Sequence, residues 1–250
     1  MKQFLKGALG QLASWLIPKG SKSFYRIRDL FFTYPAEHLD RAVRFAQAEA
    51  ETGHKYDRII DIGAANGQTA AFFAKKFPQL MVECFEPNTE YRNELEAISK
   101  AHHNIKPHFI ALGSEAATSS FYVTQNRVSS SLHEISPGPG MQESMAINRI
   151  ENVKVATLDQ MMDPGKTLIF KMDTQGSELN ILRGGVETIS RTKFVVLELM
   201  NHHMYADAAQ YFEVDQWMRK HGFKLLDIIV TYRSARGLEE FDAIYVNLNE

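Results

Sequence analysis

Two acids and two glycines within residues 61–86 have the spacing of a nucleotide-binding loop. A short apolar run ends near Asp61, and Gly63 and Gly67 follow it. A second apolar run then ends in Glu86. Glycine permits the sharp turn that such a loop makes between a strand and a helix, and Gly67 is expected to leave room for a ligand against the start of the helix. A carboxylate about twenty residues after the loop can accept hydrogen bonds from both hydroxyls of a ribose, so the spacing predicts a site for an adenosine-containing cofactor.

The number of glycines in the loop indicates which cofactor it suits. A dinucleotide loop follows the pattern G-x-G-x-x-G, in which the middle glycine makes room for the pyrophosphate. Here Gly63 and Gly67 are present and the middle glycine is missing. S-adenosylmethionine has no phosphates, and an acid such as Asp61 can hold its cationic amino group. The loop therefore favours S-adenosylmethionine, with Ala64 and Asn66 as further contacts, over the nicotinamide cofactor of an oxidoreductase.

Two more acids follow apolar runs later in the chain. Asp173 ends one such run, which also contains Lys171, and Glu198 lies near the end of the next. Ligands of open α/β sheets bind outside the carboxyl ends of the strands, so these acids favour a site over helix caps or loop charges. Lys171 is expected either to pair with an acid or to reach solvent. His202 and His203 follow closely, and each is either a general base or a loop histidine without a role.

Alternating strands and helices position these residues. Apolar runs of strand length alternate with helical patterns from residue 58 onward, which predicts a mostly parallel sheet of seven strands. The last two strands are expected to form an antiparallel hairpin with a long connection. The expected strands span residues 58–62, 81–85, 106–111, 168–173, 194–199, 223–231 and 243–248, with an accessory strand at 118–124. The expected helices that follow the first strand span residues 68–77, 89–100, 179–184 and 209–221.

Two segments fall outside this pattern. Residues 1–55 are predicted to form a helical extension before a domain of residues 56–250. Apolar residues recur at helical spacing in residues 4–16, so this helix is expected to pack on the domain or on a partner subunit, with contact to an anionic membrane as the alternative. A second helix is expected at 36–51. Serines, prolines and glycines at 125–150 indicate a loop, either a substrate lid or a passive surface excursion.

Composition narrows the class of protein. With 250 residues, 44% of them hydrophobic, the chain can bury one substantial core. A formal net charge of −2 and the lack of a basic block argue against nucleic acid as a partner. No cysteine and histidine pattern predicts a metal site. No apolar run approaches the length of about 20 residues that a spanning helix needs. The cytosol is therefore the expected compartment, with peripheral contact at the inner face of the membrane as the alternative.

Six short motifs together resemble one known family. They are DIGAANG at 61–67, EP at 86–87, ALG at 111–113, TLD at 157–159, KMDTQGSEL at 171–179 and LE at 197–198. The set resembles the FkbM family of S-adenosylmethionine-dependent methyltransferases over about residues 57–246. The run K-x-D-x-Q-G-x-E is its most specific part, and the serines at 129–131 look like the serine-containing loop of the family. Ala65 departs from the family pattern, because a bulkier or polar residue is common there.

The resemblance implies a Rossmann-like class I methyltransferase fold and methyl transfer to a hydroxyl of a sugar, glycan or polyketide-like small molecule. It also implies a cofactor contact for Leu112 of the ALG motif. In this fold the strand before Asp173 ends at the methyl group, so Asp173 is the first candidate for orienting or deprotonating the acceptor. Glu198 and His202 are second candidates. The alternatives are assistance by a divalent ion, a catalytically silent cofactor-binding module in a glycan or lipid enzyme assembly, and an NAD-dependent oxidoreductase.

Overall fold

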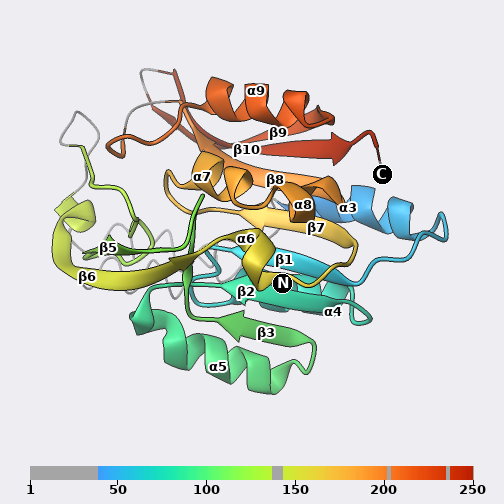
Figure 1. The fold of residues 1–250 in the computed structure, drawn as a ribbon, viewed down its shortest axis with the longest axis horizontal. Helices are drawn as coiled ribbons and strands as arrows, with labels where there is room; N and C mark the ends of the chain where they lie inside the picture. The colour runs from blue at the N-terminus through green and yellow to red at the C-terminus, as the bar shows by residue number, and fades with distance from the viewer. Residues whose placement is uncertain (1–38, 137–142, 202–203, 235–236, 250) are drawn as a thin grey trace, which may run out of the picture.

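A seven-stranded sheet forms the centre of the computed structural model, which describes residues 39–136, 143–201, 204–234 and 237–249 (Figure 1). Its strands are β1 (Arg58–Ile62), β2 (Met81–Phe85), β3 (Ile105–His108), β7 (Thr167–Met172), β8 (Thr192–Met200), β9 (Phe223–Ser234) and β10 (Gly237–Asn247). They lie in the order β3-β2-β1-β7-β8-β10-β9. β10 is antiparallel to both β8 and β9, and the other neighbouring strands are parallel. The predicted α/β fold, with a mostly parallel seven-stranded sheet and an antiparallel last strand, is confirmed.

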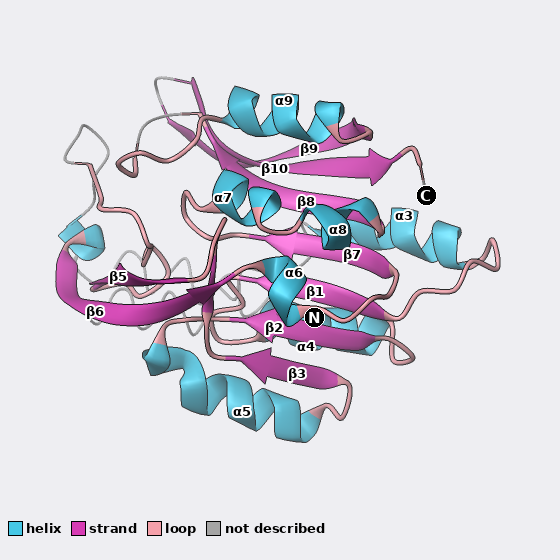
Figure 2. Cartoon of the chain, in the orientation of Figure 1, coloured by secondary structure: helices cyan, strands magenta, loops and turns pink. Residues whose placement is uncertain are grey.

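Helices cover both faces of this sheet (Figure 2). They are α3 (Asp40–Ala50), α4 (Gln68–Lys76), α5 (Arg92–Ala101), α6 (Leu158–Met161), α7 (Glu178–Arg183), α8 (Val186–Ser190) and α9 (Tyr211–Lys220). Side chains of α3, α4 and α5 pack in the core layer that contains Ile59 of β1, whereas α6 to α9 pack in the layer that contains Ile60 and Ile62. Because both faces of β1 are buried, its sequence is a nearly continuous apolar run, which made this strand recognisable.

A second, three-stranded sheet lies on the side to which the carboxyl ends of the parallel strands point (Figure 1). It has the order β4-β6-β5 and comprises β4 (Ala111–Leu112), β5 (Ala117–Thr124) and β6 (Ile147–Ala156). Two predictions are corrected here. The single strand expected at 106–111 is divided between the two sheets, and the end of the loop expected at 125–150 belongs to β6. Only the last two residues of β6 are buried, so it lacks the buried apolar face that marks a strand in sequence.

The closing hairpin is tighter than expected. β9 ends at Ser234 and β10 begins at Gly237, so the predicted long connection is wrong. The first half of β10 contains Glu239, Glu240 and Asp242. Acids are depleted in strands, so this half does not look like a strand in sequence. In the structure Asp242 pairs in register with Glu198 of β8, and both therefore lie near the carboxyl ends of the parallel strands.

The N-terminal part of the chain contributes one helix to the described structure. α3 lies within the helix expected at 36–51, and Ala42, Val43 and Ala46 are buried in the layer that contains Ile59. The helix expected at 4–16 lies outside the described residues, and the division of the chain at residue 55 stays a prediction. Among the described residues, no helix is long and apolar enough to cross a membrane.

Gly63 allows the turns after β1 and β7 to touch. Its φ angle is +74°, and a Cβ atom there would lie 1.8 Å from the backbone oxygen of Asp173. The Asp173 N–H donates to the carbonyl oxygen of Ile62 at 3.0 Å, so the two turns are also hydrogen-bonded. Gly63 is thus required both by its left-handed conformation and by close packing against another backbone.

We expect Gly63→Ala to destabilise the fold much more than Gly53→Ala. Gly53 has a similar φ of +89° but no atom within 4 Å of the added Cβ, so its substitution measures the left-handed strain alone. That strain costs about 1–2 kcal/mol. The added clash with Asp173 should bring the loss of unfolding free energy for Gly63→Ala to about 4 kcal/mol. Urea unfolding measures both variants, and equal losses would show that the two turns are not tightly packed.

Candidate functional site

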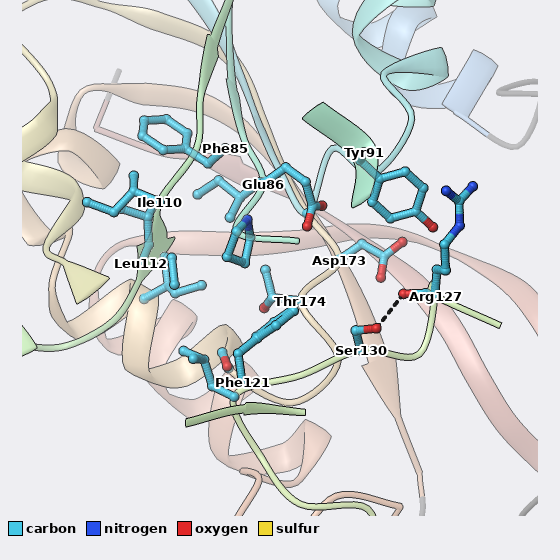
Figure 3. Close-up of a pocket in the computed structure, with 17 residues that line it drawn as sticks. Phe85, Glu86, Tyr91, Ile110, Leu112, Phe121, Arg127, Ser130, Asp173 and Thr174 are labelled. Atoms are coloured by element: carbon cyan, nitrogen blue, oxygen red, sulfur yellow. Dashed lines mark hydrogen bonds between the residues drawn. The ribbon is translucent and has the colours of Figure 1, made fainter. Parts of the chain in front are cut away.

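A cleft of about 520 Å³ opens at the carboxyl ends of β1, β2 and β7 (Figure 3). Figure 3 shows Phe85, Ile110 and Leu112 on one side of it. Tyr91, Arg127 and Asp173 lie on the other side, and Glu86 lies between the two groups. Small-ligand sites combine apolar walls with a few placed polar groups, as this cleft does. One ligand in this cleft can therefore contact both an apolar and a charged surface.

Glu86 ties the loop after β1 to the end of β2. Its Oε2 accepts a hydrogen bond from the Ala65 N–H at 2.8 Å, and its Oε1 accepts one from the Asn88 N–H at 2.8 Å. Each carboxylate oxygen has a second lone pair, so both oxygens can still accept from a ligand hydroxyl. Burial raises the pKa of Glu86 to about 7, although the hydrogen bonds from Asn88 and Ala65 oppose this.

Asp61 is fully buried, and its carboxylate has unused acceptors. Neither oxygen has a hydrogen-bond partner among the described residues. The nearest cation is Lys171, whose Nζ lies 3.9 Å from Asp61 Oδ1. Burial raises the pKa of Asp61 to about 6, whereas Lys171 lowers it. An unsatisfied buried carboxylate is costly, so this position fits a ligand that brings a positive charge or a hydrogen-bond donor.

Lys171 links Asp61 to Asp173. Asp61 and Lys171 are register partners on β1 and β7, and Asp173 follows two residues after Lys171. Lys171 Nζ lies 3.3 Å from Asp173 Oδ2. Burial opposes the charge of Lys171, but Asp173 and Asp61 outweigh it and raise the pKa of the ammonium group. Burial would also raise the pKa of Asp173, but Lys171 and hydrogen bonds from Glu198 and Gln175 lower it. Both groups are therefore charged at neutral pH.

Gln175 joins Asp173 to Glu198. It was not among the site residues predicted from the sequence. Its Nε2 donates to Asp173 Oδ1 at 2.9 Å and to Glu198 Oε2 at 2.8 Å. Burial, Asp173 and Asp242 hold the pKa of Glu198 well above its usual value. The pKa of Glu198 is therefore raised while that of its neighbour Asp173 is lowered. The signal in sequence was the amide within the Lys171–Glu178 run, whose partners only the fold brings together.

Glu178 fixes the turn that carries Gln175. Its carboxylate accepts hydrogen bonds from the Thr174 N–H at 3.0 Å, the Thr174 hydroxyl at 2.9 Å and the Gly176 N–H at 3.1 Å. This is the physical reason for an acid at the end of the K-x-D-x-Q-G-x-E run. Glu178 acts on the backbone of the turn.

Residues 125–136, which we call the serine loop, form one wall of the cleft. Arg127 and Ser130 line it, and the Arg127 guanidinium lies 4.4 Å from the centre of the Tyr91 ring. Arg127 also forms an ion pair with Glu94 of α5 at 3.2 Å. These contacts attach the serine loop to the helices that follow β2. The proposed lid role of this region stays a prediction.

The predicted cofactor residues are not all at the cleft. Gly63, Glu86 and Leu112 line it. Asn66 instead accepts a hydrogen bond from the Gln68 N–H at 3.3 Å, at the start of α4. Ala64 is buried. A Cβ atom at Gly67 would meet Leu95 at 2.9 Å and Ile98 at 3.1 Å. The expectation that Gly67 leaves room for a ligand is therefore wrong, because side chains of α5 fill this space.

The predicted catalytic residues are grouped around Asp173. Asp173 lines the cleft. Lys171 contacts Asp173 directly, and Glu198 is linked to Asp173 through Gln175. His202 lies outside the described residues, so its role stays a prediction. Among the described residues, no group of three or more histidines, cysteines and acids is placed to hold a metal ion.

Comparison with known proteins identifies one family. Residues 61–225 match the family described as Methyltransferase FkbM domain. No curated protein matches the sequence. Among solved structures, magnesium protoporphyrin IX methyltransferase from Synechocystis PCC 6803 with bound SAM is similar, with 9% identity, 98% of this chain and 94% of that chain covered and a TM-score of 0.50. Precorrin-6y C5,15-methyltransferase from Geobacter metallireducens has 12% identity, 92% and 91% coverage and a TM-score of 0.42. The first of these structures has the same fold.

We expect the ligand-free protein to lose stability as the pH rises through the pKa of Glu86. This pKa is raised to about 7, so protonated Glu86 stabilises the fold at low pH and the contribution is lost above that value. The loss between about pH 5 and about pH 8 should be on the order of 3 kcal/mol, and Glu86→Gln should remove it.

Urea unfolding at several pH values measures this slope. Glu83→Gln is the matched control, because Glu83 lies on the same strand but its hydrogen bond to His108 lowers its pKa against the effect of burial. Glu83→Gln should therefore keep the loss. A Glu86→Gln slope equal to that of the unmodified protein would contradict the assignment.

Proposed function

Because the chain belongs to the FkbM family of S-adenosylmethionine-dependent methyltransferases, we propose that it methylates a hydroxyl oxygen of a sugar, glycan or polyketide-like small molecule. The observation that carries this proposal is the ionised carboxylate of Asp173 at the cleft, between Lys171 and Gln175. A hydroxyl acceptor must lose a proton on methylation, and a carboxylate at this place can take it. The cytosol stays the expected compartment, and nucleic acid is not an expected partner.

The residues of the cleft fit the cofactor, together with the buried Asp61 that precedes the lining residue Ile62. S-adenosylmethionine supplies an electrophilic methyl group on a positively charged sulfur. Glu86 offers two carboxylate oxygens for ribose hydroxyls, and the unused acceptors of Asp61 suit a cationic amino group. Leu112, with Phe85 and Ile110, offers an apolar surface for a flat base. We propose these three roles, which place the amino group of the cofactor beside Asp61 and its ribose beside Glu86.

The proton chemistry falls to Asp173. Lys171 keeps it ionised, so it can accept a hydroxyl proton without first releasing its own. The pKa of Glu198 is raised well above its usual value, so Glu198 keeps its proton to higher pH than Asp173 does. A general base typically contributes about 10²–10⁴-fold to the rate. Alignment of the acceptor by the same carboxylate adds to this, because positioning supplies much of the acceleration in well-oriented reactions.

We expect Glu86→Ala to weaken binding of S-adenosylhomocysteine. Losing charge-assisted hydrogen bonds to ribose should cost about 1.5–3 kcal/mol, which is about 10–100-fold in Kd. Isothermal titration calorimetry measures the change. Glu83→Ala is the control, since its carboxylate on the same strand is bonded to His108. If both variants bind S-adenosylhomocysteine like the unmodified protein, Glu86 is not the ribose ligand.

We expect Asp173→Asn to bind S-adenosylhomocysteine and to lose methyl transfer by about 10²-fold or more in kcat. The substitution removes the charge and nearly preserves the volume. Glu198→Gln is the informative comparison, because Glu198 holds its proton more tightly than Asp173 and a neutral amide in its place should retain most of the rate. Single-turnover transfer from labelled S-adenosylmethionine to a panel of sugar and polyketide hydroxyls measures both.

The opposite pattern would contradict the assignment. Normal transfer by Asp173→Asn with severe loss in Glu198→Gln would place the base on β8. Failure of Asp173→Asn to bind the cofactor would make Asp173 a cofactor ligand. Cofactor binding without transfer to any hydroxyl in the unmodified protein would favour the silent binding module.

A further inference from the structure

Tyr205 is buried beside the candidate site, and its hydroxyl reaches Gln175. The side chain is 1% exposed and follows β8 in the chain. Its hydroxyl oxygen lies 2.6 Å from Gln175 Oε1 and 3.1 Å from the carbonyl oxygen of Ser129. A tyrosine hydroxyl has one hydrogen to donate, and the shorter distance identifies Gln175 as its main acceptor. Tyr205 thus connects the serine loop with the turn after β7.

This contact determines which way the Gln175 amide faces. The amide has one acceptor oxygen and one nitrogen that carries two donors. With the oxygen bonded to Tyr205, the nitrogen directs one N–H to Asp173 and the other to Glu198. The reverse orientation would place the amide oxygen against carboxyl oxygens of both acids. Tyr205 therefore favours the orientation in which Gln175 donates to both.

The backbone of Gln175 is fixed from two sides. Ser131 Oγ donates to its carbonyl oxygen at 2.7 Å. Glu178 accepts from the N–H groups of Thr174 and Gly176 on either side of it. Gln175 has a φ of +57°, which is uncommon for a residue with a side chain. Strained residues of this kind persist where the surroundings over-determine them, and they cluster at functional sites. These contacts therefore fix the backbone of Gln175, and the orientation of its side-chain amide depends on the hydrogen bonds that the amide makes.

The two acids that receive these N–H groups have different surroundings. Asp173 lies 3.3 Å from Lys171 Nζ, whereas Glu198 is the register partner of Asp242. The titratable groups that interact electrostatically with Asp173 or Glu198 are Asp61 of β1, Glu86 of β2, Lys171 of β7, Glu240 and Asp242 of β10, and Tyr205. An ionised Glu198 would face the acids of β10 without a cation of its own. A single proton on the pair is therefore more stable on Glu198 than on Asp173.

We propose that Tyr205 is a positioning residue for methyl transfer, because its hydroxyl holds the Gln175 amide so that Asp173 stays the ionised member of the pair with Glu198. This inference rests on the proposed function and deepens it, since it adds a residue thirty positions after Gln175 and outside the K-x-D-x-Q-G-x-E run. Tyr205 acts through Gln175, and the proton of the acceptor goes to Asp173. The serine loop contributes because the Ser129 carbonyl and the Ser131 hydroxyl contact the same two residues.

Titration of the carboxyl groups tests this inference without an acceptor. Carbon-13 NMR of labelled aspartate and glutamate side chains, with S-adenosylhomocysteine bound and with Asp173→Asn to assign the signal, follows the pKa of Asp173. Tyr205→Phe removes the hydroxyl and keeps the ring. A lost or weakened hydrogen bond from Gln175 should raise the pKa of Asp173 by about one unit. Tyr245→Phe is the matched control, because Tyr245 is 1% exposed and its hydroxyl donates to Asp215 of α9.

The rate of methyl transfer provides a second readout. Ionised Asp173 is the active form, so the rate rises with pH through its pKa. In Tyr205→Phe this acidic limb should move to higher pH by the same amount, and kcat should recover at alkaline pH. Gln175→Met, which keeps the length of the side chain and removes the amide, should shift the limb at least as far. It carries the test if Tyr205→Phe fails to fold.

An unchanged Asp173 titration in folded Tyr205→Phe would overturn the proposal. So would an equal shift in Tyr245→Phe, or a loss of rate that is the same at every pH. Absence of any methyl transfer by the unmodified protein would instead contradict the proposed function, and the carboxyl titration would still decide the role of Tyr205.

Discussion

The buried ammonium group of Lys171 is the interaction on which the site depends. It lies between Asp61 and Asp173, at 3.9 Å and 3.3 Å, with almost no exposure to solvent. Removing one partner of a buried ion pair typically costs about 3–5 kcal/mol, because an uncompensated charge stays behind. Lys171 balances an acid on each side. It therefore links the acid proposed for the cofactor amino group to the acid proposed for the acceptor proton.

Sheet register and one glycine make this arrangement possible. Asp61 and Lys171 are partners on adjacent parallel strands, so their side chains lie on the same face of the sheet. Gly63 then lets the turn after β1 pack against the backbone of Asp173. The two halves of the proposed site are thus held by backbone packing as well as by charge. A substitution in either turn should therefore shift residues in both halves of the proposed site.

The sequence predicted those parts of the fold that depend on local pattern. β1 and β2 have the predicted bounds because they are buried on both faces and follow one another with short connections. The four acids at strand ends were recognised from the same runs. β6 and the first half of β10 were missed, because only the last two residues of β6 are buried and the first half of β10 carries three acids. Gly67 was expected to leave room for a ligand, but side chains of α5 fill the space beside it.

Contacts between distant segments could not be read from the sequence. Gln175 was quoted within a motif, but its partners Glu198 and Tyr205 are 23 and 30 residues away. The assignment of Asp173 as ionised likewise depends on Lys171 on one side and on the acids of β10 beyond Glu198. Spacing along the chain reports neither distance nor burial across the sheet. These pairings appear only once β7, β8 and β10 lie side by side.

Neutron diffraction from perdeuterated crystals with S-adenosylhomocysteine at neutral pH measures the central claim directly. The charges described above predict three deuterium atoms on Lys171 Nζ, none on the carboxylate of Asp173 and one on the carboxyl group of Glu198. Deuterium on Asp173, or a neutral Lys171, would contradict the account, because Asp173 would then have no capacity to accept the proton of a hydroxyl acceptor.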